Sequence, residues 1–179
     1  IPDAPYGIHY IAPDKMAVWL KELDQRGYGA HIHTIGDDGV RSALDAIEAA
    51  RKRGSIRDYT LTHVEMLDRQ DLPRFRPLDV TADFQLGSDY IVEGDHDWAV
   101  PLLGHERTER LMPVGPLYRS GANISLSSDW NVHELNPLVG IANSLLMGAN
   151  GLPDIHVAID AYTINAARSL GLEQHIGSL

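Results

Sequence analysis

Four side chains that could bind a metal ion lie at the ends of predicted strands. The stretch HIHTIGD places His31 and His33 two residues apart, His63 lies in LTHVE, and Asp129 lies in SSDW. Imidazole and carboxylate groups suit zinc, manganese or iron, and the chain has no cysteine to supply a thiolate. One such histidine pair is a weak signal, because two buried histidines bonded to the backbone would look the same. Three of the four successive predicted strands end in such ligands, and this co-occurrence favours a metal site.

Alternating helices and strands would bring these residues together. Such alternation predicts an α/β fold, a parallel sheet with helices outside, whose active site lies at the carboxyl ends of the strands. The pattern fits half of a (β/α)₈ barrel or an open doubly wound sheet, and 179 residues are too few for a full barrel of about 250. The polar stretch 87–104 is too long for a simple connection and is expected to form a substrate loop or lid. Strands are predicted at 28–34, 58–65, 79–86 and 122–130, and helices at 14–26, 38–53, 70–77, 105–120, from Pro137 onward and at 155–170.

Other polar residues near these strand ends have weaker claims to a role in the site. Asp37 and Asp38 are expected to cap the helix that follows them, and Asp37 could also bond a ligand histidine. Glu65 shares a strand face with His63 and could support the site in the same way. His133 follows Asp129 in the same loop and could meet a substrate, although a solvated loop residue is the simpler interpretation.

Composition and charge exclude several classes of protein. The net charge of −10 argues against nucleic-acid binding, and the one basic cluster, Arg51–Arg53, fits the carboxyl end of a helix. There is no apolar run of about 18 residues and no signal-peptide pattern at the start. We therefore expect a single domain over residues 1–179 in a cytoplasmic protein, with no nucleic-acid or membrane partner.

Longer stretches of the sequence resemble the amidohydrolase superfamily. The match is closest to its YtcJ-like branch, which includes N-substituted formamide deformylases. It rests on HIHTIGDDGVRSALDAIE, LTHVEMLDRQDLPRF, GANISLSSDWNVHELNPLVGI and AIDAYTINAARSLGLEQHIGSL, which occur in family order and cover most of residues 28–179. The resemblance implies a metal-dependent (β/α)₈ TIM barrel beside a small β-sandwich. This chain would then be a partial barrel, approximately strands 5 to 8 with their flanking helices.

The resemblance also implies roles for individual residues. His33 corresponds to the metal ligand on strand 5, with His31 as the alternative, and His63 to the strand 6 histidine, which binds metal or positions water or substrate. Asp129 corresponds to the strand 8 aspartate, which binds metal and acts as general base and then general acid. The implied cofactor is one or two divalent ions, zinc first and manganese or iron as alternatives. The implied reaction is hydrolysis of an amide or formamide C–N bond through a metal-activated water.

The chain also departs from the family pattern. The first histidine pair on strand 1 and any bridging ligand on strand 4 are absent, Asn131 replaces a usual proline, and Glu65 replaces a more common glutamine. We therefore expect a portion of a longer hydrolase that is inactive alone and that associates with its own missing part or forms a homo-oligomer. Two alternatives remain: an inactive truncated α/β fragment or scaffold, and a metal-dependent phosphoesterase-like barrel. The second is disfavoured because no Lys or Arg accompanies the candidate ligands to hold a phosphate.

Overall fold

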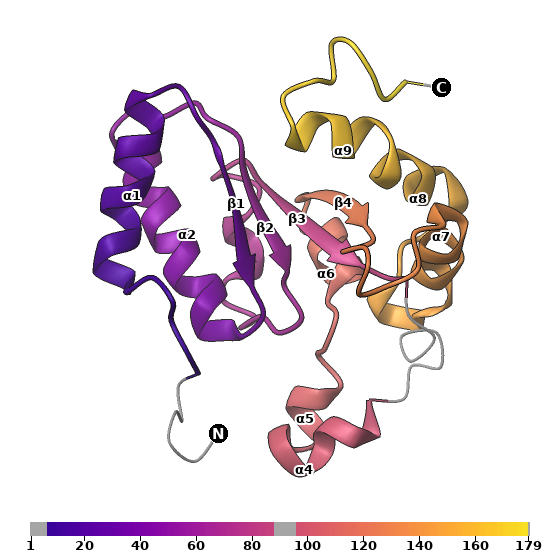
Figure 1. Ribbon diagram of the computed structural model, residues 1–179. Coiled ribbons are helices and arrows are strands. Elements are labelled where there is room, and N and C mark those ends of the chain that lie inside the picture. Colours follow the sequence, from indigo (N-terminus) through magenta and orange to yellow (C-terminus); the bar gives the residue numbers. More distant parts are fainter. Residues whose placement is uncertain (1–6, 88–95, 179) are drawn as a thin grey trace.

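The computed structural model describes residues 7–87 and 96–178. In this part of the chain, four strands form one parallel sheet in the order β1-β2-β3-β4. The order along the sheet is the order along the chain, and helical segments connect the strands, so the predicted α/β fold with a parallel sheet is confirmed (Figure 1). The strands are β1 (Ala30–Thr34), β2 (Tyr59–His63), β3 (Val80–Gln85) and β4 (Asn123–Ser127).

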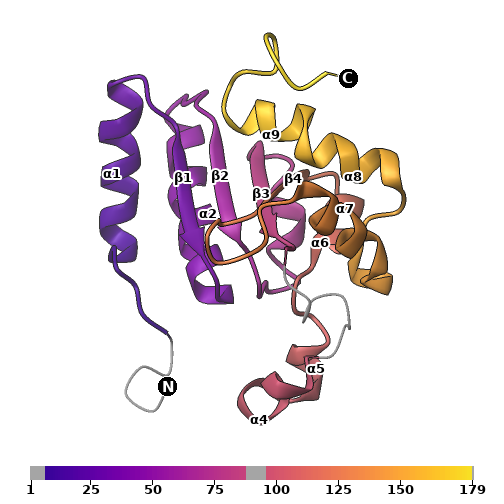
Figure 2. The same cartoon turned by 45° about the vertical axis from the view of Figure 1, so that its right-hand side comes forward.

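The helices surround the sheet and extend beyond one of its ends. Helices α1 and α2 lie beside β1 and β2, α7 to α9 lie on the side of β4, and α4 and α5 lie beyond the carboxyl end of the sheet (Figures 1 and 2). No helix in the described ranges is long and apolar enough to cross a membrane. The longer helices are α1 (Pro13–Gln25), α2 (Asp37–Lys52), α6 (Val114–Arg119), α7 (Pro137–Leu146), α8 (Ile155–Tyr162) and α9 (Ile164–Ser169). The shorter ones are η1 (Leu72–Arg74), η2 (Asp97–Ala99), α4 (Val100–Leu103), α5 (His105–Thr108) and η3 (Gly148–Asn150).

One face of the sheet is apolar and forms the hydrophobic core. Ile32, Leu61, Ala82 and Ile124 are aligned side by side across the four strands. They belong to one hydrophobic cluster that includes the apolar side of α2, where Leu44 and neighbouring residues are fully buried. Each fully buried Leu or Ile contributes about 1.5–3 kcal/mol through the hydrophobic effect, so this face holds the strands in position. The opposite face is therefore free to carry polar groups.

The structure confirms the predicted N-terminal cap of α7 and corrects the predicted cap of α2. The Asn136 side chain accepts a hydrogen bond of 3.0 Å from the backbone N–H of Leu138, which confirms it as the cap of α7. The capping prediction for Asp37 and Asp38 is wrong, because Gly36 occupies the cap position of α2. Both aspartates lie in the first turn, where their charge complements the helix dipole instead.

The predicted helix over 105–120 is two separate helices, α5 and α6. Pro113 has no N–H to donate, and Met112 before it adopts a left-handed backbone with φ of 53°. The N–H of Met112 donates to the carbonyl oxygen of Glu65 at 2.8 Å, so this break is fixed to the segment after β2. Residues 88–95 of the polar stretch expected to form a loop or lid lie outside the described residues, and the part after them forms η2 and α4.

Two further helix predictions are corrected by the structure. The helix expected over 155–170 breaks at Thr163, whose φ of −118° and ψ of −93° separate α8 from α9. The helix expected over 70–77 is only the short 3₁₀ segment η1 within a series of turns. Pro73 and Pro77 lack the N–H groups that a regular helix would need there.

Candidate active site

The polar face of the sheet carries the first predicted residues. His31 and His33 are both exposed, and their neighbours on β1 are more buried, so the two histidines share a face as their spacing predicts. His33 is aligned with Thr62, Thr62 with Asp83, and Asp83 with Ser125. A polar row thus crosses all four strands at the level of His33.

A cavity of about 390 Å³ lies against this polar face near the carboxyl ends of the strands. Helix α9 forms part of its wall. Its lining includes all four residues predicted from the sequence and two more from β3: His31, His33, His63, Asp129, Asp83 and Gln85. All four predicted residues therefore line one cavity.

His33 and His63 are in direct contact. Their ring centroids are 4.3 Å apart, with 64° between the ring planes. Simple strand alternation would direct His63 to the face opposite Thr62 and His33. The backbone instead turns left-handed at the end of β2, with φ of 72° at His63 and 46° at Val64. Such conformations cost of order 1–3 kcal/mol each and collect at functional sites, which fits two imidazoles held together for a ligand.

Burial and nearby charges set the protonation of His63. Burial, followed by the charge of His33, lowers its pKa, whereas Asp129 and Asp83 raise it and His133 lowers it further. The net direction of the pKa of His63 is downward, which favours the neutral imidazole, the form that ligates a metal.

Asp129 lies two residues beyond the end of β4 and is exposed. Its φ of 49° makes it another left-handed residue at the end of a strand, and its carbonyl oxygen accepts from the N–H of Val132 at 2.7 Å. The donor types fit a divalent ion such as zinc, and the two imidazoles are already paired. Within residues 7–87 and 96–178, however, no three His, Asp or Glu side chains lie close enough together to hold an ion. The shared site of His33, His63 and Asp129 therefore stays a prediction.

Asp83 is the central residue of the polar face, a role that the sequence analysis did not assign to it. Asp83 is only 5% exposed, and its carboxylate accepts hydrogen bonds from four side chains on three strands. The donors are Thr62 Oγ1 at 2.9 Å and Gln85 Nε2, Ser125 Oγ and Ser127 Oγ at 2.7 Å each. Charge-assisted hydrogen bonds of this kind stabilise a buried carboxylate. A signal was present in the sequence, since Thr81, Asp83 and Gln85 alternate with apolar residues along β3.

Gln85 adds an acceptor to the same cavity. Its Nε2 donates to Thr62 Oγ1 and Ser127 Oγ at 2.8 Å each, in addition to Asp83. Its Oε1 is buried and has no hydrogen-bond partner among the described residues. A bound molecule with an N–H or O–H group could satisfy this oxygen.

Asp37 and Glu65, the two residues considered as supports for the ligands, lie in different surroundings. The carboxylate of Asp37 accepts a bond of 2.9 Å from Arg107 Nη2 and so links α2 to α5; no bond from Asp37 to a ligand histidine is found in the described part. Glu65 is partly buried, and burial raises its pKa, while the charges of His133 and His33 lower it. Glu65 therefore interacts electrostatically with His133 and His33, and its role as a support for the site stays a prediction.

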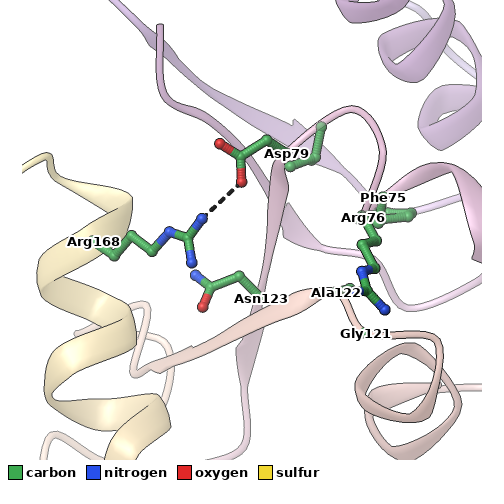
Figure 3. Close-up of a pocket in the computed structure, with 8 residues that line it drawn as sticks. Phe75, Arg76, Asp79, Gly121, Ala122, Asn123 and Arg168 are labelled. Carbon is green, nitrogen blue, oxygen red and sulfur yellow. Dashed lines mark hydrogen bonds and ion pairs between the residues drawn. The ribbon is translucent and has the colours of Figure 1, made fainter. Parts of the chain in front are cut away.

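A second cavity, of about 380 Å³, lies at the other end of the sheet (Figure 3). It opens beside Val80 and Asn123, which begin β3 and β4, and Arg168 on its wall donates to Asp79 at 2.9 Å. That bond ties α9 to the start of β3. Active sites of parallel α/β folds lie at the carboxyl ends of the strands, so this cavity belongs to the stabilising end of the fold.

Comparison with known proteins gives a family for the chain. A sequence model of the Amidohydrolase family matches residues 4–179. Protein LONG AFTER FAR-RED 3 of Arabidopsis thaliana is 29% identical over 97% of this chain and 31% of its own length. Putative amidohydrolase YtcJ of Bacillus subtilis is 25% identical over 89% of this chain and 32% of its own length.

The fold is similar to that of larger solved structures. The crystal structure of an uncharacterized metal-dependent hydrolase from Pyrococcus furiosus superposes with a TM-score of 0.81 and 22% identity. The superposition covers 97% of this chain and 35% of that one, so the chain spans about a third of the length of its relatives. The parallel four-stranded sheet is consistent with part of a (β/α)₈ barrel, and the chain belongs to the amidohydrolase family.

Proposed function

We propose that this chain carries part of the active site of a metal-dependent hydrolase that cleaves an amide or formamide C–N bond. The observation that carries the proposal is the contact between His33 and His63 at the carboxyl ends of the strands, 4.3 Å between ring centroids, with Asp129 on the wall of the same cavity. Two imidazoles and a carboxylate are a suitable ligand set for zinc, with manganese or iron as alternatives. Family membership and the fold of the metal-dependent hydrolase from Pyrococcus furiosus support the same assignment.

Each of these side chains has a distinct proposed task. His33 and His63 would hold a divalent ion, with Asp129 as a further ligand and His31 as the alternative on β1. Such an ion supplies a Lewis acid that lowers the pKa of water from about 15.7 toward 7 and polarises a carbonyl. The Asp129 carboxylate accepts the proton of the attacking water and then donates it to the leaving amine, as general base and then general acid. In its alternative role, His63 would stabilise the negative charge that develops on the carbonyl oxygen instead of binding the ion.

Metal content and amine release test this proposal in the longest natural protein that contains the chain. We expect the purified protein to bind divalent metal and to release amine from N-formyl or N-acyl amines, with loss on chelation and recovery when metal is restored. His33→Ala should lower the bound metal, whereas His175→Ala, at an exposed position far along the chain, should not. A protein that binds no divalent metal and hydrolyses none of these amides would contradict the proposal.

The 179 residues studied alone should behave differently from the longer protein. Within the described residues β1 and β4 each pair along one edge only, and His31 and His33 on β1 are exposed. Open strand edges pair with other chains, and closure of the sheet removes them. We therefore expect the isolated chain to be oligomeric or partly disordered, to bind metal weakly and to show no turnover. Sizing chromatography with zinc titration checks this, and a stable monomer with tight stoichiometric metal would count against it.

A further inference from the structure

One residue of the loop between β4 and α7 is less exposed than its neighbours. From Asp129 to Leu138 every residue is exposed except His133, which is partly buried. The exposed residues include large apolar ones, with Trp130 and Val132 each 69% exposed. The least exposed residue of this loop is therefore a polar histidine and not one of its large apolar residues. This pattern points to a specific role for the His133 side chain.

The loop rests on Gly87, just beyond the end of β3. A Cβ atom at Gly87 would lie 2.9 Å from the carbonyl oxygen of Glu134 and 3.1 Å from the Cβ of His133. The N–H of Glu134 also donates to the carbonyl oxygen of Gly87 at 3.4 Å. Only a residue without a side chain permits this approach, so Gly87 fixes where the loop crosses the sheet.

His133 extends this contact toward β2. A positive charge on His133 would lower the pKa of both His63, at the end of β2, and Glu65, two residues further on. Because β3 lies between β4 and β2, the loop must cross the carboxyl end of β3 for His133 to approach these two residues. The backbone of Glu65 is itself held by the bond from Met112 N–H.

We propose that His133 and Gly87 together position Asp129, by fixing the β4–α7 loop over the strand ends. His133 is thus a positioning residue that acts through Asp129 and His63, and the inference rests on the proposed function. Asp129 is exposed, and its backbone bond to Val132 lies within the same loop, so the loop itself must be held in place. Displacement of a reacting group by about 1 Å can cost about 100-fold in rate.

The test compares His133→Ala, Gly87→Ala and the double variant in the longest natural protein that contains this chain. Zinc affinity is measured by titration with zinc alone, together with kcat and KM for an N-formyl amine and the unfolding temperature. We expect each single change to weaken zinc binding about tenfold, within the range for groups that support metal ligands. Turnover should fall, while KM and the unfolding temperature change little. The double variant should be no worse than the poorer single variant, because both changes release the same loop.

Matched controls separate this effect from general damage. Gly39→Ala adds a methyl group where nothing lies within 4 Å, and His156→Ala removes an exposed imidazole from α8. Both should keep the zinc affinity and turnover of the unmodified protein. If Gly87→Ala does not fold, His133→Ala decides the question by itself.

The possible results distinguish this inference from the proposed function. Unchanged zinc affinity and turnover in His133→Ala would overturn the positioning role alone. A rise in KM without loss of zinc affinity would also overturn it, because His133 would then contact the substrate directly. In the double variant, the fold-losses of the two single variants could instead multiply. The two residues would then act separately, and their shared role would be rejected. An unmodified protein that neither binds zinc nor hydrolyses amides would refute the proposed function, and the inference with it.

Discussion

Replacement of Asp129 by asparagine is expected to lower turnover by about 10²–10⁴-fold, the usual contribution of a general acid–base group. Asparagine has nearly the same shape, and Asp129 is exposed at the end of β4, so the fold should be preserved. The amide cannot accept the proton of the attacking water and return it to the leaving amine. Steady-state kinetics on an N-formyl or N-acyl amine, with circular dichroism and metal content of the same sample, measures the effect.

The control for this prediction is Asp160→Asn. Asp160 is exposed on α8, outside the lining of the cavity near the strand ends, so this variant should keep full turnover. Comparison of the two variants removes any general effect of losing one negative charge. A folded, metal-loaded Asp129→Asn protein with unchanged turnover would show that another group transfers the proton.

The second large effect is expected on stability, from Asp83→Ala. The carboxylate is the shared acceptor for Thr62, Gln85, Ser125 and Ser127, all of which are at least half buried. Its removal leaves several buried donors with fewer partners, and hydrogen bonds to a charged group contribute about 1.5–3 kcal/mol each. We expect the free energy of unfolding to fall by roughly 3 kcal/mol or more, measured by urea denaturation at pH 7.

Asp14→Ala is the matched control for that measurement. The Asp14 side chain is 73% exposed, and its ion pair with Lys15 at 3.4 Å is equally open to solvent. Exposed ion pairs contribute about 0–1 kcal/mol, so this variant should unfold almost like the unmodified protein. A loss below about 1 kcal/mol for Asp83→Ala would mean that water replaces the missing carboxylate and that the network is less important than its geometry indicates.

The sequence by itself determined the class of fold and the shared strand face of His31 and His33. The alternation of apolar segments predicted a parallel α/β sheet, because strand and helix periods are properties of local sequence. The spacing of His31 and His33 was enough to place both on one face of β1, as observed. The same local logic correctly predicted the cap at Asn136, whose partner is only two residues away.

Helix continuity was less predictable. The break at Met112 and Pro113 is accompanied by a bond to Glu65, a contact between segments far apart in the sequence. Periodicity alone cannot show that a distant carbonyl group will take the N–H of Met112. The break at Thr163 likewise lies inside a segment that reads as one helix, and no local signal marked it.

Only the tertiary structure decided which side chains meet at the site. Alternation would have turned His63 away from His33, but the left-handed backbone at His63 and Val64 brings the two rings together. Such a conformation is unfavourable for a residue with a side chain and persists only where the surrounding structure imposes it. The partial burial of His133 depends in the same way on the close approach of its loop to Gly87. The residue types were readable along the chain, whereas their directions depend on contacts between strands and loops that fold from distant parts of the sequence.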